Sequence, residues 1–158
     1  MMKFLIFAFL VGCVTALTTP CRNCNTVKGP KGANAPTPTG TCKTVSIEPC
    51  TQQPCELKKG TNITFSVQFT ANAAATTLTS EVYGVINGVP VKFNLPNPNG
   101  CKESGITCPL VAGETYTYKD ALYISHLYPA INLVVKWSLL DQAGSPIFCV
   151  VAPAKITS

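Results

Sequence analysis

Nine cysteines in a chain of 158 residues constrain its fold more than any other feature of the sequence. One of them, Cys13, lies in an apolar N-terminal segment. The others are Cys21, Cys24, Cys42, Cys50, Cys55, Cys101, Cys108 and Cys149. An even number of cysteines in a short secreted chain is typical of a disulfide framework. We therefore predict four disulfides within one small domain.

The N-terminal segment has the features of a secretory signal peptide. Lys3 precedes the apolar stretch Phe4–Val14, and the small residues Thr15 and Ala16 follow it. A basic start, a short apolar core and a small-residue exit are the pattern that signal peptidase cleaves. The stretch is shorter than the ~20 apolar residues that a membrane-spanning helix needs. We predict that residues 1–16 are removed and that the mature protein is secreted.

Spacing alone favours only two of the disulfides. Cys50 and Cys55 enclose a short turn-rich loop, and so do Cys101 and Cys108. The pairing of the other four cysteines stays open at this point, because eight cysteines allow many combinations.

The spacing Cys21-x-x-Cys24 also occurs in redox and zinc sites. Zinc requires further free thiolates or histidines, and His126 is the only histidine of the chain. A thioredoxin-type site requires a βαβ context, which the flanking sequence lacks. We therefore expect neither a metal ion nor a redox cofactor.

Apolar residues recur with a period of two along most of the chain. The pattern is clear over Ile63–Thr70 and again over Ile131–Leu139, and it is typical of strands with one buried face. Asn87-Gly88 lies between Glu81–Ile86 and Val89–Phe93, which is a strong signal for a β-hairpin. The other predicted strands are Lys43–Glu48, Glu114–Lys119, Leu122–Ser125 and Pro146–Ala152.

These segments predict an all-β fold. Seven or eight short strands separated by Gly, Pro and Asn turns are typical of an antiparallel sandwich or barrel. Residues 25–40 are rich in Gly and Pro and form a predicted surface insertion. We therefore divide the mature chain into an N-terminal extension, residues 17–41, and a β-domain, residues 42–158.

Two broad function classes find no support in the residues. Charged residues make up 12% of the chain, and Lys58-Lys59 is the only adjacent basic pair of the mature chain, whereas nucleic-acid binding requires a basic cluster. His126 lies without the glycines of a nucleophile elbow, and no pair of carboxylates has the pattern of an acid–base couple. We predict a protein that is not an enzyme and binds no nucleic acid.

One modification motif is present. Asn62-Ile63-Thr64 is the only N-glycosylation sequon. Asn62 belongs to the polar side of its alternating segment, which is the orientation that a glycan requires.

Seven short motifs, in this order, carry a resemblance to a known family: Val45–Cys50, Leu57–Gly60, Val82–Val91, Pro96–Cys101, Gly105–Leu110, Tyr116–Tyr118 and Leu133–Trp137. The ordered set resembles the ML (lipid-recognition) domain family. It is most similar to the Niemann–Pick type C2 or epididymal secretory branch, which includes arthropod secreted members.

The resemblance implies an immunoglobulin-like β-sandwich with an apolar cavity between its sheets. It also implies the disulfides Cys50–Cys55, Cys101–Cys108 and Cys24–Cys149, which leaves Cys21–Cys42 as the fourth pair. The lipid-binding positions that it implies are Ile47, Leu57, Ile63, Phe65, Val91, Phe93, Ile124, Tyr128, Pro129, Val135 and Trp137. Without the resemblance, the same alternating residues describe an ordinary sandwich core.

The function implied is that of a secreted carrier. Such a protein holds a sterol or fatty-acid-like ligand, with no cofactor, and delivers it to a membrane or a receptor. Two alternatives are an innate-immune protein that recognises microbial lipids and a carrier of hydrophobic semiochemicals. We expect a monomer in the extracellular fluid or the lysosomal lumen. Lys92, expected near the mouth of the cavity, is a candidate for transient contact with anionic membranes.

Overall fold

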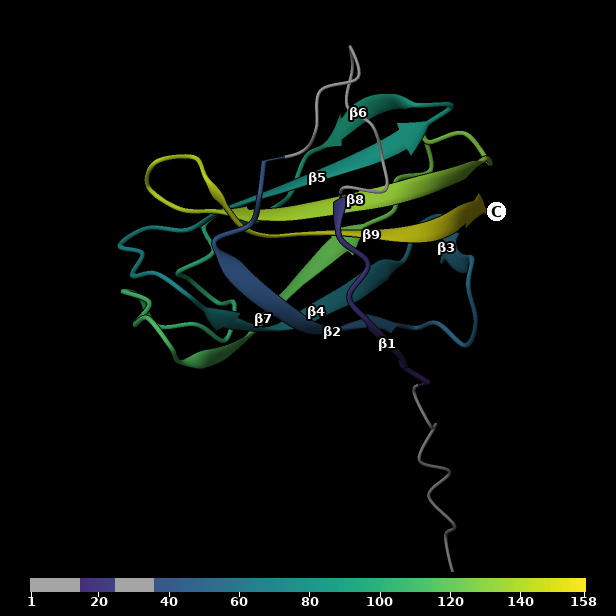
Figure 1. Cartoon of the computed structure of the whole chain (residues 1–158). Helices are drawn as coiled ribbons and strands as arrows, with labels where there is room; N and C mark the ends of the chain where they lie inside the picture. The colour runs from purple at the N-terminus through teal and green to yellow at the C-terminus, as the bar shows by residue number, and fades with distance from the viewer. Residues whose placement is uncertain (1–14, 25–35) are drawn as a thin grey trace, which may run out of the picture.

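Strands account for the regular structure of the molecule (Figure 1). The computed structural model describes residues 15–24 and 36–158, so most of the predicted signal peptide and residues 25–35 of the insertion lie outside the described residues. The described ranges contain no α-helix. Their strands are β1 (Leu17–Pro20), β2 (Gly40–Glu48), β3 (Cys55–Lys58), β4 (Asn62–Ala71), β5 (Thr79–Ile86), β6 (Val89–Phe93), β7 (Thr115–Tyr123), β8 (Asn132–Leu140) and β9 (Pro146–Thr157).

The strand count differs from the predicted seven or eight in two ways. The segments predicted at Glu114–Lys119 and Leu122–Ser125 form the single strand β7, because Asp120 and Ala121 continue the pairing with β4. The strands β1 and β3 were not predicted. Each has only four residues, too few to show a period, and each depends on pairing with a distant strand.

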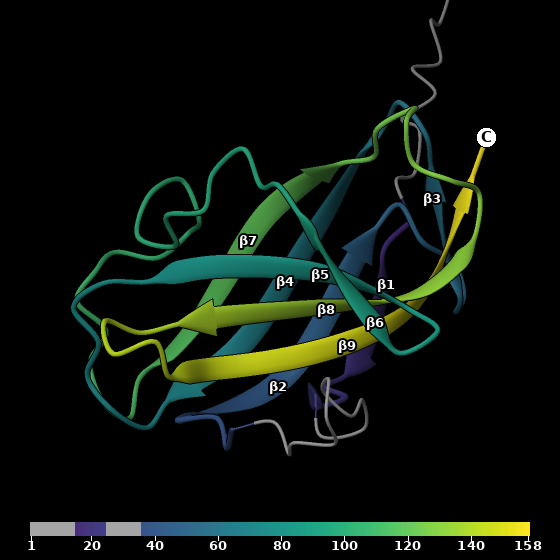
Figure 2. The same ribbon diagram turned by 90° about the horizontal axis from the view of Figure 1, so that it is seen from above.

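The strands form two facing sheets. Their orders are β1-β2-β4-β7 and β3-β9-β8-β5-β6, and Figure 2 shows the strands of one sheet crossing those of the other at an angle. All pairs are antiparallel except β3 and β9, which run parallel with Cys55 opposite Ala154. The sandwich is therefore not wholly antiparallel. The chain leaves β2 in one sheet and enters β3 at the edge of the other, and this crossover sets the direction of β3.

The alternating segments bury one face each, as the sequence predicts. The large apolar residues of the inward faces are buried: Ile63, Phe65, Val67 and Phe69 along β4, and Leu133, Val135, Trp137 and Leu139 along β8. Burying a side chain of this size contributes roughly 1.5–3 kcal/mol. The predicted hairpin joins β5 to β6, with positive φ angles of 49° at Asn87 and 80° at Gly88, as the tightest hairpin turns require.

Four disulfides are present, with the pairing that the resemblance implies: Cys21–Cys42, Cys24–Cys149, Cys50–Cys55 and Cys101–Cys108. Two of them connect one sheet to the other on the same side of the molecule. Cys24–Cys149 ties the segment after β1 to β9, and Cys50–Cys55 ties the end of β2 to β3. On this side the Thr39 amide also donates to the Pro146 carbonyl at 2.8 Å. We call this side the linked edge.

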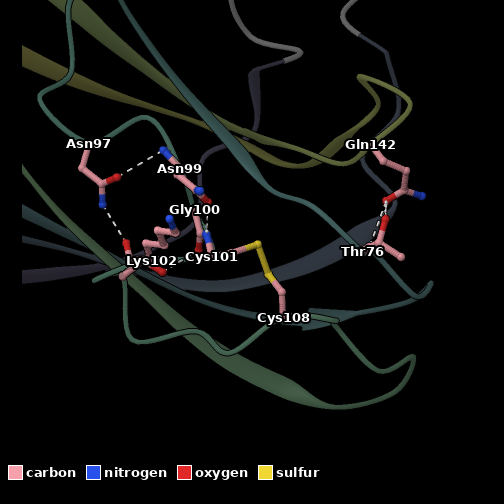
Figure 3. The surroundings of a disulfide bond; sticks show 9 residues. Thr76, Asn97, Asn99, Gly100, Cys101, Lys102, Cys108 and Gln142 are labelled. Carbon is pink, nitrogen blue, oxygen red and sulfur yellow. Dashed lines mark hydrogen bonds between the residues drawn. A yellow bond between two sulfur atoms is a disulfide. The ribbon is translucent and has the colours of Figure 1, made fainter.

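The long β6–β7 connection is held by its own hydrogen bonds around Cys101–Cys108 (Figure 3). The Asn97 side-chain amide donates to the Lys102 carbonyl at 2.7 Å, and the Asn99 side-chain oxygen accepts from the Cys101 amide at 2.9 Å. Asparagine side chains that satisfy nearby backbone groups stabilise turns of this kind. The connection is therefore an ordered part of the sandwich.

Candidate functional site

An apolar cavity lies between the two sheets. Its wall consists of side chains from six strands, and none of them is polar: Ile47, Cys55, Leu57, Ile63, Phe65, Leu122, Val135, Trp137, Ala152 and Ala154. The wall can offer a guest molecule dispersion contacts and exclusion from water. A charged or hydrogen-bonding group has no partner there.

The cavity is small in this structure. Its volume is about 20 Å³, close to the space that one water molecule occupies, whereas drug-sized ligands occupy pockets of roughly 300–1,000 Å³. Two residues of the wall, Phe65 and Trp137, stack on each other with ring centroids 4.4 Å apart and planes nearly parallel at 3°. The expected apolar cavity is present, but it is closed at this size. A lipid can enter only if these side chains or the sheets move apart.

Six of the eleven predicted lipid-binding residues line this cavity: Ile47, Leu57, Ile63, Phe65, Val135 and Trp137. They come together because each lies on the inward face of its strand, at the same end of the sandwich. Four further residues of the wall were not predicted as lipid-binding: Cys55, Leu122, Ala152 and Ala154. The two alanines lie on β9 in the alternating series Val150, Ala152, Ala154, Ile156, all buried, and that period was the available signal.

Three other predicted residues are buried or half-buried outside the cavity wall. Ile124 is fully buried in the core. Phe93 at the end of β6 is buried, and its ring meets the ring of half-buried Tyr128 edge-on, with centroids 5.1 Å apart. Gly84 leaves room for this arrangement, because a Cβ atom there would lie 2.8 Å from the Phe93 ring. The Phe93–Tyr128 contact closes the gap between β6 and the β7–β8 loop.

The last two predicted residues lie on the surface. Val91 is 51% exposed, and Pro129 is exposed in the β7–β8 loop. Neither lines the cavity. Leu127 in the same loop is 93% exposed. These exposed apolar residues lie close in sequence to Phe93 and Tyr128, which are in contact.

Lys92 was expected near the mouth of the cavity, but its side chain lies on the outer face of the sheet. It lies next to Phe93 on β6, and adjacent strand residues point to opposite faces. Its Nζ is 3.3 Å from the Glu81 carboxylate and 5.9 Å from the centre of the Tyr83 ring, on the outer face of the sheet. The charge of Lys92 is therefore compensated by Glu81 and directed away from the cavity.

A buried polar cluster lies behind the cavity wall. The Trp137 indole Nε1–H donates to Ser80 Oγ at 2.7 Å, and the Tyr118 hydroxyl oxygen lies 2.8 Å from Ser80 Oγ and 3.1 Å from Asp120 Oδ2. Burial raises the pKa of Tyr118 above its usual range. Burial also raises the pKa of Asp120, against the opposing effect of hydrogen bonds from the Ala121 amide and Tyr118. Both groups therefore favour their uncharged forms more than they would in water.

His126 is exposed, with its ring over Gly60. Residues 15–24 and 36–158 contain no group of three or more His, Cys, Asp or Glu side chains placed to hold a metal ion. These ranges also lack a helix long and apolar enough to cross a membrane.

Comparison with known proteins assigns the family. The family model of the ML domain matches residues 18–156. The chain is 43% identical over 114 residues to a zebrafish protein named NPC intracellular cholesterol transporter 2, covering 72% of this chain and 76% of the relative. It is 41% identical over 120 residues to homolog a of that transporter from Drosophila melanogaster, covering 75% and 81%.

A solved structure agrees with these matches. The crystal structure of a Niemann–Pick type C2 protein from the Japanese carpenter ant superposes with a TM-score of 0.71 at 29% identity, covering 75% of this chain and 93% of that one. Sequence and architecture therefore lead to the same result: this chain belongs to the ML domain family, within its Niemann–Pick type C2 branch.

Proposed function

We propose that this protein is a secreted carrier that holds a sterol or fatty-acid-like molecule between its sheets and delivers it to a membrane or a receptor. The observation that carries the proposal is the cavity wall without a polar side chain. The relatives named as cholesterol transporters support it. The proposal includes no enzymatic activity.

The wall selects the chemistry of the ligand. Apolar surface removed from water contributes about 25 cal/mol per Å², whereas a polar group buried without a partner costs about 1–3 kcal/mol. A ligand therefore gains most by inserting a hydrocarbon part and leaving its hydroxyl or carboxylate outside. Sterols and fatty acids have this division.

The linked edge suggests where the sandwich opens. Two disulfides and the Thr39–Pro146 hydrogen bond hold the sheets together there. On the opposite side, where β6 and β7 are the edge strands, the Phe93–Tyr128 contact joins β6 to the loop after β7. A contact between two rings separates more readily than a covalent link, so the ligand enters past Phe93 and Tyr128.

Delivery requires a surface that can meet a membrane or a receptor. Val91 and Leu127 are exposed on the two elements that Phe93 and Tyr128 bring together. Because Lys92 is paired with Glu81, we expect apolar contact to contribute more than its charge. Lipid transfer between vesicles should fall for Leu127→Asp and change little for Lys92→Ala. The reverse order would refute this route.

The experiment that tests the carrier function is identification of the bound lipid. The mature protein is purified from its native source and extracted, and the extract is analysed by mass spectrometry. A stoichiometric sterol or fatty acid is the expected result. A microbial lipid would favour the recognition role and a volatile signal the semiochemical role, whereas purified protein that neither contains nor binds any lipid would refute all three.

We also propose that Asn62 carries an N-glycan. Its side chain is exposed at the first residue of β4, so the glycan would not displace any core residue. Digestion of secreted protein with peptide N-glycosidase should lower its mass, and Asn62→Gln should remove that shift. A shift that persists in the variant would assign the glycan elsewhere.

A further inference from the structure

The polar cluster behind the cavity has an arrangement that the carrier function does not by itself require. It joins residues of both sheets: Ser80 on β5, Tyr118 and Asp120 on β7, and Trp137 on β8. Figure 1 shows where these three strands lie. Ser80, Tyr118 and Trp137 are 3%, 1% and 1% exposed. In the described part of the chain, no buried side-chain nitrogen or oxygen lacks a hydrogen-bond partner.

The chemistry of the groups fixes the direction of the hydrogen bonds. An indole N–H can only donate and an ionised carboxylate can only accept, whereas each hydroxyl has one proton to donate. The Tyr118 hydroxyl lies within donating distance of both Ser80 Oγ and Asp120 Oδ2 but has only one proton. When that proton is donated to an ionised Asp120, the Ser80 hydroxyl must be the donor between Ser80 and Tyr118, and Trp137 donates to Ser80. Each proton then has one acceptor, and the chain runs from the half-buried Asp120 to the buried indole.

The cluster and the cavity meet only at Trp137. The indole belongs to the cavity wall, but Ser80, Tyr118 and Asp120 do not line the cavity. The Trp137 ring also stacks on Phe65 and contacts the Tyr118 ring edge-on at 6.3 Å. The Ser80 hydrogen bond therefore holds the only polar atom of this side chain behind the wall.

We propose that Ser80 and Tyr118 are positioning residues that hold the Trp137 N–H away from the cavity and make its inner wall apolar. The inference rests on the proposed carrier function, and it specifies the ligand further. The buried part of the ligand carries no hydrogen-bonding group, since any such group would meet only carbon and sulfur.

Loss of either hydroxyl should change the wall. In Ser80→Ala the indole N–H has no partner, and a buried unsatisfied donor is costly. The ring then relieves this cost by turning its N–H toward the cavity or toward water. Either response weakens binding of a hydrocarbon part. We expect an affinity about tenfold lower, from the usual cost of an unpaired buried donor.

The test uses the single tryptophan of the chain as its own reporter. In ligand-free protein, the one indole N–H signal in a ¹H–¹⁵N spectrum should move upfield and exchange faster in Ser80→Ala than in wild type. Tyr118→Phe, which keeps the ring and removes the hydroxyl, should move it in the same direction. Ser80→Thr, which keeps a hydroxyl, should restore the signal.

Ser138→Ala is the matched control. Ser138 is also buried and is adjacent to Trp137 on β8, but its hydroxyl donates to Cys149 Sγ on the other face of the sheet. The Trp137 indole signal of Ser138→Ala should match that of wild type. A Ser80→Ala protein with the wild-type signal, or a control that shifts equally, would overturn the positioning role.

Two fluorescent probes complete the experiment, dehydroergosterol for sterols and cis-parinaric acid for fatty acids. Wild type and Ser138→Ala should bind at least one probe equally well, and Ser80→Ala and Tyr118→Phe should bind it about tenfold more weakly. Equal affinity in all four proteins would overturn this inference alone. A wild-type protein that binds neither probe, nor any extracted lipid, would instead overturn the carrier function together with the selectivity inferred here.

Discussion

At the scale of single residues, glycine has two different roles in this molecule. At Gly84 it provides space: a Cβ there would lie 2.8 Å from the Phe93 ring and 2.9 Å from the Leu133 side chain. At Gly88 it provides backbone freedom: the φ angle is +80° and nothing lies within 4 Å of the missing Cβ. The same substitution should therefore act differently at the two positions.

Gly84→Ala should displace Phe93 and weaken ligand binding, because the added methyl group lies against the ring that closes the gap between β6 and the β7–β8 loop. Overpacking of this kind costs about 1–3 kcal/mol of unfolding free energy. Gly88→Ala should cost about 1 kcal/mol through backbone strain and leave binding unchanged. Chemical denaturation and probe titration of both variants measure the difference, and equal binding losses would contradict it.

Asp120 should make the stability depend on pH. Its pKa is raised in the folded protein by burial, so the folded state holds a proton more tightly than the unfolded state does. This contribution to stability is fully present below the pKa of the unfolded chain and is lost as the pH rises through the folded pKa.

Asp120→Asn should therefore stabilise the protein at neutral pH, because an amide oxygen still accepts from Tyr118 and no charge is buried. It should give no such gain at pH values below the unfolded pKa. Urea denaturation across this pH range checks the sign. A variant that is less stable than wild type at neutral pH would show that the charge, and not the acceptor, is what Tyr118 needs.

At the scale of elements, β3 depends on its neighbours more than on its own sequence. Its four residues pair in parallel with β9 at the sheet edge, and Cys50–Cys55 fixes its first residue. A four-residue strand has little intrinsic preference to form, so the disulfide limits the freedom of the segment before β3.

Replacing Cys50 and Cys55 together with serine should lower the unfolding free energy by about 2 kcal/mol, the low end of the usual range because the loop is short. The backbone amides of Cys55–Lys58 should lose most of their hydrogen-exchange protection. Replacing Cys101 and Cys108 instead is the control, and it should leave the protection of β3 unchanged. Full protection of β3 without its disulfide would show that pairing with β9 is sufficient.

At the scale of the whole molecule, a closed cavity must be reconciled with a lipid ligand. The cavity between the sheets has a volume of about 20 Å³, so we expect side chains or the sheets to move apart for binding, on the side where no disulfide joins the sheets. We expect the ligand to take the place of the Phe65–Trp137 stack between the sheets. Opening costs free energy, and contact with the hydrocarbon offsets it.

Ligand binding should consequently stabilise the folded protein. A ligand at one hundred times its dissociation constant adds about 2.7 kcal/mol to the unfolding free energy, which calorimetry detects as a higher Tm. Ala152→Phe should fill the space beside Ala154 and abolish the shift. A Tm shift of wild-type size in that variant would place the ligand outside this cavity.

The sequence by itself determined the strands with a clear period, the hairpin at Asn87-Gly88 and the local disulfide loops. These features depend on residues that are neighbours in the sequence. The alternation along β4 or β8, for example, indicates which face of the strand is buried. The order of short motifs added the family, and with it six residues of the cavity wall.

Tertiary structure alone decided which edges are linked, how small the cavity is and which way Lys92 points. It also placed Ser80 behind Trp137, although 57 residues separate them. Such features arise where segments far apart in the sequence meet. A local sequence pattern does not determine the distance between two sheets. The same physical limit explains why β1 and β3 were missed, since each forms only against a strand far away in the sequence.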